Sequence, residues 1–418
     1  MAGRRSVILL AGLACVALAV PDSALSISRS HLRHGLAKQM KRVGGGSGAF
    51  VSDIDATRKR TLFGWASHTR RILASNTKLF TMAALLDRYG ARATFKTRVY
   101  PRPAGAIQGH TLHGSLVVVG AGDPALGKRS FARRYGLPST PLGRLARQVR
   151  KAGIKRVTGK VLADASIFDR RRGIPTSGVD ASGELGPLSG LSYDSGIVHG
   201  HYAKNPELVA VRALRHKLHA AGVHVSGTGR ANLPARAQRR EPLASVSSPT
   251  VGTLLAATLR PSNNFFAETL LKRLAASRAG AKGTTRRGAR RARKFTRRVG
   301  SRVSMENGSG LSRADRASPR AVARLLIAMD RRPERGVFRR SLPLAGEQGT
   351  VAGRMNGTAA DGHCRTKTGT LIGVSALSGY CDAGHGLVAF SILMNSADVD
   401  VARHAQDRMA ALIARYRR

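Results

Sequence analysis

The chain has 418 residues, and its 71 Lys and Arg outnumber its 23 Asp and Glu to give a formal net charge of +48 at pH 7. Hydrophobic residues make up 42% and aromatic residues 5%, which excludes a chain too polar to bury a core and predicts mostly aliphatic packing. The length suits two domains, or one large domain that carries an insertion. The charge favours adhesion to polyanions such as DNA, anionic lipids or anionic wall polymers, and is equally compatible with a surface merely rich in arginine.

The first 26 residues have the pattern of a secretion signal. Arg4 and Arg5 give a short positive start, residues 7–20 form an apolar run, and Pro21 ends it. This run has 14 residues, whereas a helix that crosses a bilayer needs about 20. A cleaved signal is therefore favoured over a retained anchor, and we expect an exported protein that is periplasmic or associated with the cell wall.

The N-terminal half contains predicted strands and a helix, followed by a segment of different composition and pattern. Residues 27–47 are basic and then Gly-rich, which is typical of a flexible leader. Two strands and a helix with apolar residues three and four apart are predicted next. Their ranges are 48–54, 60–65 and 78–89. Between residues 99 and 245, short β-rich runs such as 115–119 and 156–162 alternate with Gly and Pro, which predicts an inserted β-rich domain.

Helices return in the C-terminal half. Residues 250–259 and 265–275 have helical spacing. A dense basic run at 282–298 forms either a solvated helix face or a polyanion patch, the solvated face being favoured. Three strands and a final helix are predicted at residues 365–371, 376–381, 386–394 and 399–416. Strands at both ends with helices between them predict an α/β layer, built from residues 48–98 and 246–418 around the insertion.

A Ser-x-x-Lys sequence stands at the start of the first predicted helix. Ser75 lies three residues before Lys78, and residues three apart share a helix face. A lysine in that position can take the serine proton if burial and neighbouring charge lower its pKa. The pattern is weak by itself, because a Ser and a Lys three apart are usually incidental. Yet Lys78 is the only lysine of the chain with a serine three residues before it.

Two further motifs follow in the order that serine acyl-transfer enzymes of the Ser-x-x-Lys type require. Ser262-Asn263-Asn264 precedes a predicted helix, where a helix N-cap is the structural alternative. Lys367-Thr368-Gly369 lies in a predicted strand, where glycine either lets a ligand approach the backbone or marks an ordinary edge strand. Three weak patterns in the right order and context together predict a serine acyl-transferase.

The segments around these motifs resemble the class C low-molecular-weight penicillin-binding proteins, the D-alanyl-D-alanine carboxypeptidase/endopeptidase family. The resemblance covers about residues 48 to 396. It is carried by residues 74–79, 122–126, 161–168, 264–272, 307–313, 342–346 and 367–380. It implies a β-lactamase/transpeptidase-like fold, in which helices flank an antiparallel sheet, with the β-rich insertion between the Ser-x-x-Lys and Ser-x-Asn motifs.

The resemblance also implies roles for the motif residues. Ser75 would attack the carbonyl carbon between two D-alanines and form an acyl-enzyme, with Lys78 as its general base. Ser262 and Lys367 would relay the proton to the leaving amine, and Asn264 would hold the substrate backbone.

The strand of the third motif would bind the rest of the substrate. Its terminal carboxylate would be bound by Lys367, Thr368 and Thr370, with Gly369 allowing close approach. The backbone N–H groups of Ser75 and Thr370 would form the oxyanion hole. The resemblance implies no metal and no other cofactor.

Two positions outside the motifs resemble residues that face the substrate's own side chain. Asp164, from the insertion, would face an amine, and Arg313 would face a carboxylate, a pair that suits an amino-carboxylate such as diaminopimelate. The structural alternatives are a turn-capping aspartate and a surface arginine. Asn307 and Ile372 depart from the family pattern and put this side-chain specificity in doubt.

The implied partners are peptidoglycan peptides and β-lactam antibiotics, with anionic cell-wall polymers as a further candidate and no dedicated nucleic-acid partner. Two alternative functions stay open. A β-lactamase or esterase on the same fold would need an efficient deacylating base, which the sequence does not identify. A non-enzymatic polyanion-binding wall protein would explain the charge but would leave the ordered motifs unexplained.

Two cysteines follow the predicted signal. If the strands on either side of Ile372 and Gly373 form a hairpin, Cys364 and Cys381 are cross-strand neighbours, and residues 371–374 form the loop. Cross-strand Cβ atoms lie ~4.5–5.5 Å apart, slightly more than the ~3.8 Å of a disulfide, so bonding requires a modest strand adjustment. Because the two cysteines are neighbours in this hairpin, a disulfide is expected, and the long Cβ spacing leaves two reduced thiols as the alternative.

Overall fold

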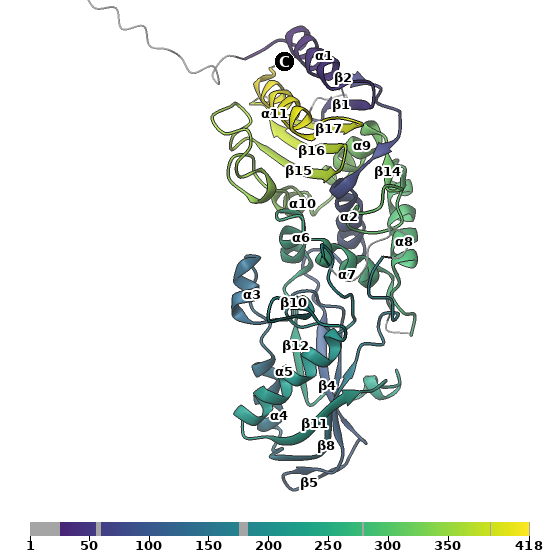
Figure 1. Cartoon of the computed structure of the whole chain (residues 1–418), viewed down its shortest axis with the longest axis vertical. Helices are drawn as coiled ribbons and strands as arrows, with labels where there is room; N and C mark the ends of the chain where they lie inside the picture. The colour runs from purple at the N-terminus through teal and green to yellow at the C-terminus, as the bar shows by residue number, and fades with distance from the viewer. Residues whose placement is uncertain (1–25, 56–59, 175–182, 278–279, 385, 418) are drawn as a thin grey trace, which may run out of the picture.

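The structure is a computed structural model that describes residues 26–55, 60–174, 183–277, 280–384 and 386–417. Figure 1 shows an elongated molecule, with a five-stranded sheet and its helices at one end and a second sheet at the other. The predicted signal, except for its last residue, lies outside the described residues. Within the described ranges, no helix is long and apolar enough to cross a membrane.

The five-stranded sheet is antiparallel and joins strands from both ends of the chain, in the order β15-β16-β17-β1-β2. The N-terminal part supplies β1 (Ser47–Asp53) and β2 (Arg60–Trp65). The C-terminal part supplies β15 (Cys364–Leu371), β16 (Val374–Asp382) and β17 (Leu387–Asn395). Because β1 pairs with β17, neither end of the chain forms this layer alone.

Helices cover both faces of this sheet. On one face, α1 (Arg29–Val43) packs on α11 (Val399–Arg415), which lies on β16. On the other face, α9 (Pro319–Asp330) packs on β17, and α2 (Thr77–Tyr89) belongs to the same core. The other helices here are α6 (Val251–Leu259), α7 (Asn264–Ala275), α8 (Thr285–Arg298) and α10 (Arg335–Ser341). A small sheet of β13 (Val303–Ser304), β14 (Arg316–Ala317) and β3 (Arg71–Ile72) completes this half.

Helix α1 occupies most of residues 27–47, so the predicted flexible leader is wrong. Ser28 caps the helix with its side-chain oxygen. Leu32, Leu36 and Met40 are at most 1% exposed and pack toward α11. Their four-residue spacing is an apolar helix stripe. Basic residues between them make the segment polar on average, so its composition conceals the stripe.

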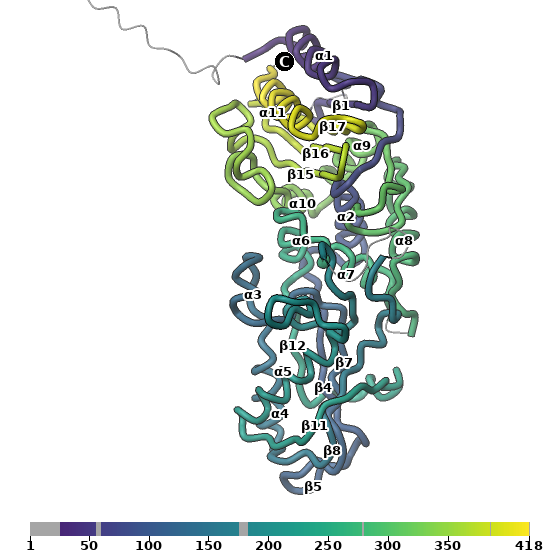
Figure 2. The backbone as a smooth tube through the Cα atoms, in the orientation of Figure 1, coloured from purple at the N-terminus to yellow at the C-terminus, as the bar shows by residue number. Residues whose placement is uncertain are grey.

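The insertion forms a mixed seven-stranded sheet of its own, in the order β12-β4-β7-β8-β6-β5, with β11 also paired to β8. Its strands are β4 (Lys96–Arg102), β5 (Ile107–Gln108), β6 (Thr111–Leu112), β7 (Ser115–Val119), β8 (Arg156–Asp164), β11 (His224–Arg230) and β12 (Ala244–Ser247). Two further short strands of the insertion, β9 (Ile197–Val198) and β10 (His201–Tyr202), pair with each other in a separate two-stranded sheet. The first and last strands, β4 and β12, pair with each other, so the chain enters and leaves the insertion side by side (Figure 2).

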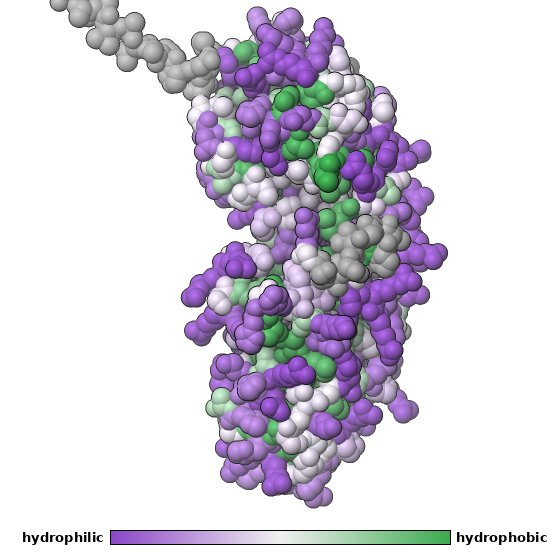
Figure 3. Space-filling model, in the orientation of Figure 1, coloured by the Kyte–Doolittle hydropathy of each residue, from purple (hydrophilic) through white to green (hydrophobic). Residues whose placement is uncertain are grey.

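The insertion also contains helices that the sequence did not predict. They are α3 (Arg129–Arg134), α4 (Leu142–Lys151) and α5 (Pro206–Ala220). In α4 the buried residues Leu142, Leu145, Ala146 and Val149 lie three and four apart, with arginines between them. The description of this segment as β-rich was therefore incomplete. Hydrophilic residues cover most of the face of the molecule seen in Figure 3, as the net charge predicts.

The β15–β16 hairpin has the cross-strand register that the sequence predicts. Cys364 pairs with Cys381, and their sulfur atoms are bonded. The pairing continues to Leu371 and Val374, so the turn has two residues rather than the expected four. Gly373 has a φ of 68°, a conformation that glycine adopts without strain.

Candidate active site

Ser75 lies in a tight turn of 3₁₀ helix, η2 (Ala74–Asn76), that leads directly into α2. Two glycines let neighbouring backbone approach this turn. A Cβ on Gly369 of β15 would lie 2.8 Å from Leu73 O and 3.1 Å from Ser75 N. A Cβ on Gly310 would lie 1.8 Å from Ala74 O. Any side chain at these two positions would collide with the turn, so both glycines are required for this arrangement.

Lys78 is fully buried one helical turn after Ser75. Its Nζ lies 2.9 Å from Ser75 Oγ, 2.7 Å from Asn264 Oδ1 and 2.7 Å from Ser309 O. Two of these neighbours are carbonyl oxygens, which only accept hydrogen bonds. A neutral amine has two N–H donors and one lone pair, so it can satisfy both carbonyls and direct its lone pair at the serine hydroxyl.

The surroundings of Lys78 favour the neutral amine. Burial lowers the pKa of Lys78 to about 7, against the opposing charge of Glu268 and more distant acids. Glu268, from α7, is itself fully buried, and its Oε1 accepts from the N–H groups of Gly308 and Ser309 at 2.7 and 2.6 Å. Glu268 therefore fixes the loop whose carbonyl contacts Lys78. The sequence reasoning missed it, although an acidic residue in an apolar helix one turn after Asn264 is a usable pattern.

A second serine–lysine pair lies beside the first. Lys367 Nζ lies 2.9 Å from Ser262 Oγ and 2.8 Å from Thr368 O. Burial, followed by the charge of Lys78, holds the pKa of Lys367 well below its ordinary value. Asn76 donates to Lys367 O at 3.1 Å, so β15 is bonded directly to the turn that carries Ser75.

The middle residue of the Ser-x-Asn motif is the helix cap. Asn263 precedes α7, and its side chain accepts from Phe266 N at 2.9 Å. The capping role therefore belongs to Asn263, and Ser262 and Asn264 direct their side chains to the two lysines. A structural function and a site function are combined in three consecutive residues.

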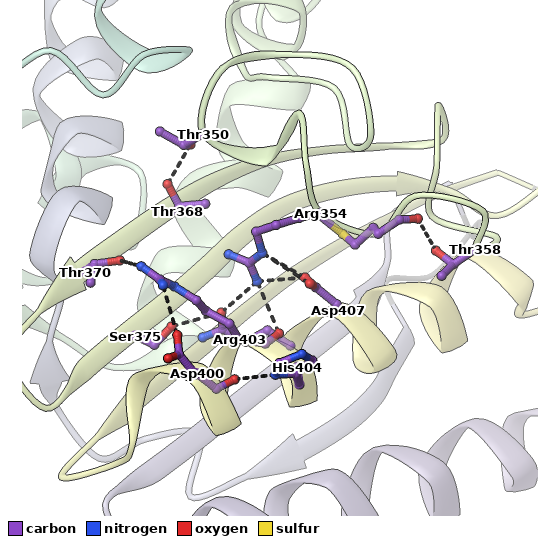
Figure 4. Close-up of polar contacts among 12 residues, drawn as sticks. Thr350, Arg354, Thr358, Thr368, Thr370, Ser375, Asp400, Arg403, His404 and Asp407 are labelled. Carbon is purple, nitrogen blue, oxygen red and sulfur yellow. Dashed lines mark hydrogen bonds and ion pairs between the residues drawn. The ribbon is translucent and has the colours of Figure 1, made fainter.

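Figure 4 shows Thr368 and Thr370 of β15, which contact residues that the sequence did not identify. Thr368 Oγ1 lies 2.7 Å from Thr350 Oγ1, which comes from η6 (Gly349–Val351). Arg403 of α11 donates to Thr370 Oγ1 at 3.5 Å and pairs with Asp400 at 3.1 Å. No motif distinguishes Arg403 in a chain this rich in arginine, and only the packing of α11 under the sheet places it there.

The two residues proposed to contact the substrate's side chain, Asp164 and Arg313, differ in burial and in their hydrogen-bond partners. Asp164 is 1% exposed, and its two oxygens accept from the N–H groups of Ser166 and Leu233 at 2.8 and 2.7 Å. The carboxylate thus has the turn-capping role in this structure. Arg313 is exposed and donates to Ile372 O at 3.0 Å, at the turn that ends β15.

Within the described residues, no three His, Cys, Asp or Glu side chains are grouped closely enough to hold a metal ion. His219, in the insertion, contacts Val225 O at 2.8 Å through its ring, which is a structural contact between α5 and β11.

Comparisons with known proteins agree with this arrangement. The model of the D-Ala-D-Ala carboxypeptidase 3 (S13) family matches residues 34–199 and 198–416. The D-alanyl-D-alanine carboxypeptidase of Actinomadura sp. (strain R39) is 29% identical over 446 residues, which cover 87% of this chain and 80% of the relative. Carboxypeptidase Rv3627c of Mycobacterium tuberculosis is 28% identical over 361 residues, covering 81% and 74%.

Solved structures share the fold. Penicillin binding protein 4 (dacB) from Haemophilus influenzae superposes with a TM-score of 0.72 at 19% identity, over 90% of this chain and 97% of that chain. Bd3459, a predatory peptidoglycan endopeptidase from Bdellovibrio bacteriovorus, gives a TM-score of 0.53 at 15% identity over 87% and 91%. These matches confirm the predicted fold class and the family resemblance. The chain belongs to the D-Ala-D-Ala carboxypeptidase 3 (S13) family.

Proposed function

We propose that the protein is a serine D-alanyl-D-alanine carboxypeptidase/endopeptidase that acts on peptidoglycan stem peptides and cross-links. The observation that carries this proposal is the set of neighbours around Lys78 Nζ, where two carbonyl oxygens and one serine hydroxyl match a neutral amine. Such an amine is a general base in hydrogen-bond contact with its nucleophile.

The reaction follows from this geometry. Ser75 Oγ bonds to the carbonyl carbon of the penultimate D-alanine, and its proton passes to Lys78 Nζ. The C–N bond to the terminal residue then breaks, and the leaving nitrogen takes a proton through Ser262 and Lys367. Water hydrolyses the resulting ester, which releases the shortened peptide and restores the Ser75 hydroxyl. The N–H groups of Ser75 and Thr370 would receive the developing oxyanion.

The edge of β15 suits the terminal carboxylate of the substrate. Lys367, Thr368 and Thr370 are the donors proposed there, and Arg403 adds a positive charge that contacts Thr370. An arginine that donates to the Thr370 oxygen leaves the hydroxyl hydrogen free to be directed at the carboxylate. Arg313, at the other side of the same turn, remains the candidate for a carboxylate on the substrate's side chain.

The test of this proposal combines penicillin labelling and peptide hydrolysis. The purified protein is expected to form a long-lived penicillin adduct that peptide mapping places on Ser75, and to release D-alanine from a peptide ending in D-Ala-D-Ala. Ser75→Ala should lose both activities, whereas Ser247→Ala, an exposed serine of β12, should keep both. An adduct that persists in Ser75→Ala contradicts the assignment, and rapid turnover of penicillin would indicate a β-lactamase instead.

We also propose that the protein is exported and works at the cell wall. The pattern of residues 1–26 supports export. The Cys364–Cys381 bond supports an oxidising compartment, because disulfides are rare in the cytosol. Fractionation of cells that produce the full chain tests this, and retention of the uncleaved chain in the cytosol would contradict it.

A further inference from the structure

A hollow of about 1000 Å³ lies between α8, the small sheet and the start of α9, away from the groups around Ser75. No acidic residue is among the described residues that line it. Its charged and titratable lining consists of six arginines and one histidine: Arg70, Arg293, Arg297, Arg302, Arg320, Arg324 and His68. We call this hollow the arginine groove. Three separate stretches of chain contribute these side chains, so the concentration of charge is a product of the fold and not of one basic run.

The groove continues along α8. A second hollow of about 990 Å³ shares Arg293 with it and is also lined by Arg286 and Arg290. Residues 286, 290, 293 and 297 are four, three and four apart, so they lie on one face of the helix. They span roughly 16 Å at ~1.5 Å per residue. The opposite face, with Ala292 and Phe295, is buried. The solvated face predicted from the sequence is thus a row of arginines along two adjoining hollows.

Among the residues that the structure describes, no acidic side chain pairs with the arginines of the groove. Arg298 and Arg332, just outside the groove, share Asp87. Within it, Arg293 donates to Met305 O at 2.7 Å, and Arg320 contacts the ring nitrogen of His68 at 3.2 Å, both uncharged groups. The acidic residues of the adjoining hollow are engaged: Asp169 pairs with Lys272, and Glu306 accepts from Ser312. The positive potential of the groove therefore remains available to a ligand.

We propose that the arginine groove binds a linear phosphodiester polymer of the cell wall. Guanidinium groups recognise phosphate oxygens in bidentate fashion, and a row of them along a channel matches a chain with regularly repeated phosphates. A concave groove suits a polymer strand better than the flat surface of a membrane. The choice of a wall polymer over a nucleic acid rests on the export and wall location proposed above.

The groove is coupled to the nucleophile by short segments. Arg70 precedes Ser75 by five residues, so the two lie within about 18 Å of each other even along a fully extended chain. The loop that contacts Lys78 follows directly after β13, whose Ser304 lines the groove. A polymer held there would keep Ser75 close to peptides of the same wall, which would raise their effective concentration.

The experiment measures binding of poly(glycerol phosphate) to the full chain as a function of salt. Arg297→Gln/Arg302→Gln/Arg324→Gln removes three exposed groove charges. Arg133→Gln/Arg144→Gln/Arg147→Gln removes three exposed charges from the insertion. The groove variant should bind at least about tenfold more weakly at 0.15 M salt and show a shallower salt dependence. The insertion variant should stay within about twofold of the parent.

Equal losses in the two variants would overturn the proposal, because they would show non-specific attraction. Tighter binding of single-stranded DNA or of anionic lipid vesicles, at equal phosphate concentration, would also overturn it in favour of those ligands. Penicillin acylation of Ser75 should be unchanged in both triple variants, which reports their folding and separates this proposal from the enzymatic one. If the groove triple variant fails to acylate, Arg302→Glu alone supplies the binding comparison.

Discussion

Lys78 Nζ lies 2.9 Å from Ser75 Oγ, and its two remaining contacts are to carbonyl oxygens. Only the neutral amine can accept the serine proton, and burial lowers the pKa of Lys78 to about 7. Below that pH the amine is protonated and inactive as a base. The rate of acylation by penicillin should therefore rise with pH through about 7 and level off above it. A rate that still climbs toward pH 10, the range of an ordinary lysine near ~10.4, would contradict this.

Glu268→Gln should shift the rise in acylation rate with pH, the acid limb of the pH–rate profile, to lower pH. The glutamine oxygen can still accept from the N–H groups of Gly308 and Ser309, so the loop keeps its geometry. The negative charge that raises the pKa of Lys78 is lost, so the pKa of Lys78 should fall. The same pH profile measures it. An unmoved acid limb would show that the buried carboxyl, whose own pKa is raised by burial, is already protonated.

Gly369→Ala should impair acylation and leave the protein folded. The new methyl group would lie 2.8 Å from Leu73 O and 3.1 Å from Ser75 N, which pushes β15 away from the nucleophile. A displacement of this kind costs on the order of 10²-fold in rate. Gly64→Ala is the matched control, because a Cβ on that strand glycine meets nothing closer than 3.4 Å. Equal acylation rates for the two variants would show that the close approach is not needed.

Arg403→Gln should weaken the binding of substrates that carry a free terminal carboxylate. Losing one charged donor next to Thr370 should raise KM by roughly tenfold, equivalent to about 1.4 kcal/mol, with little change in kcat. A substrate amidated at its C-terminus should be affected far less by the substitution. Arg408→Gln, an exposed arginine of the same helix, controls for charge alone. Parallel losses on both substrates would assign Arg403 a purely structural role.

Removal of the Cys364–Cys381 bond should destabilise the hairpin that carries Lys367. The bond closes a loop with a sequence separation of 17, worth roughly 3 kcal/mol on the chain-entropy model. Cys364→Ala/Cys381→Ala should therefore unfold at a lower denaturant concentration than the parent protein. Thiol titration of the unfolded, non-reduced protein should find both cysteines unreactive, and two free thiols per chain would end the idea.

Much of the site could be predicted because its chemistry is local in sequence. Ser75 and Lys78 share one helix face, and the strand around Lys367 is marked by its pattern. Glu268 and Arg403 could not be predicted, because their positions depend on packing between distant segments. Helix α1 was not predicted for a different reason: three apolar residues four apart are enough to bury it on α11, although the average composition is basic. The role of Asp164 stays a prediction, since a matching segment does not fix which way a carboxylate is turned, and its oxygens accept from two backbone N–H groups.

The pairing of β1 with β17 dictates an order of events during synthesis. The insertion has all of its strands once residue 247 has been made. β1 can pair with β2 at once, whereas its other neighbour, β17, ends only at Asn395. Until residue 371 has been made, the turn that carries Ser75 has no β15 beside it and no Lys367 near Ser262. A chain that stops before β15 therefore carries Ser75 without Lys367, and the groups around Ser75 can assemble only late in synthesis.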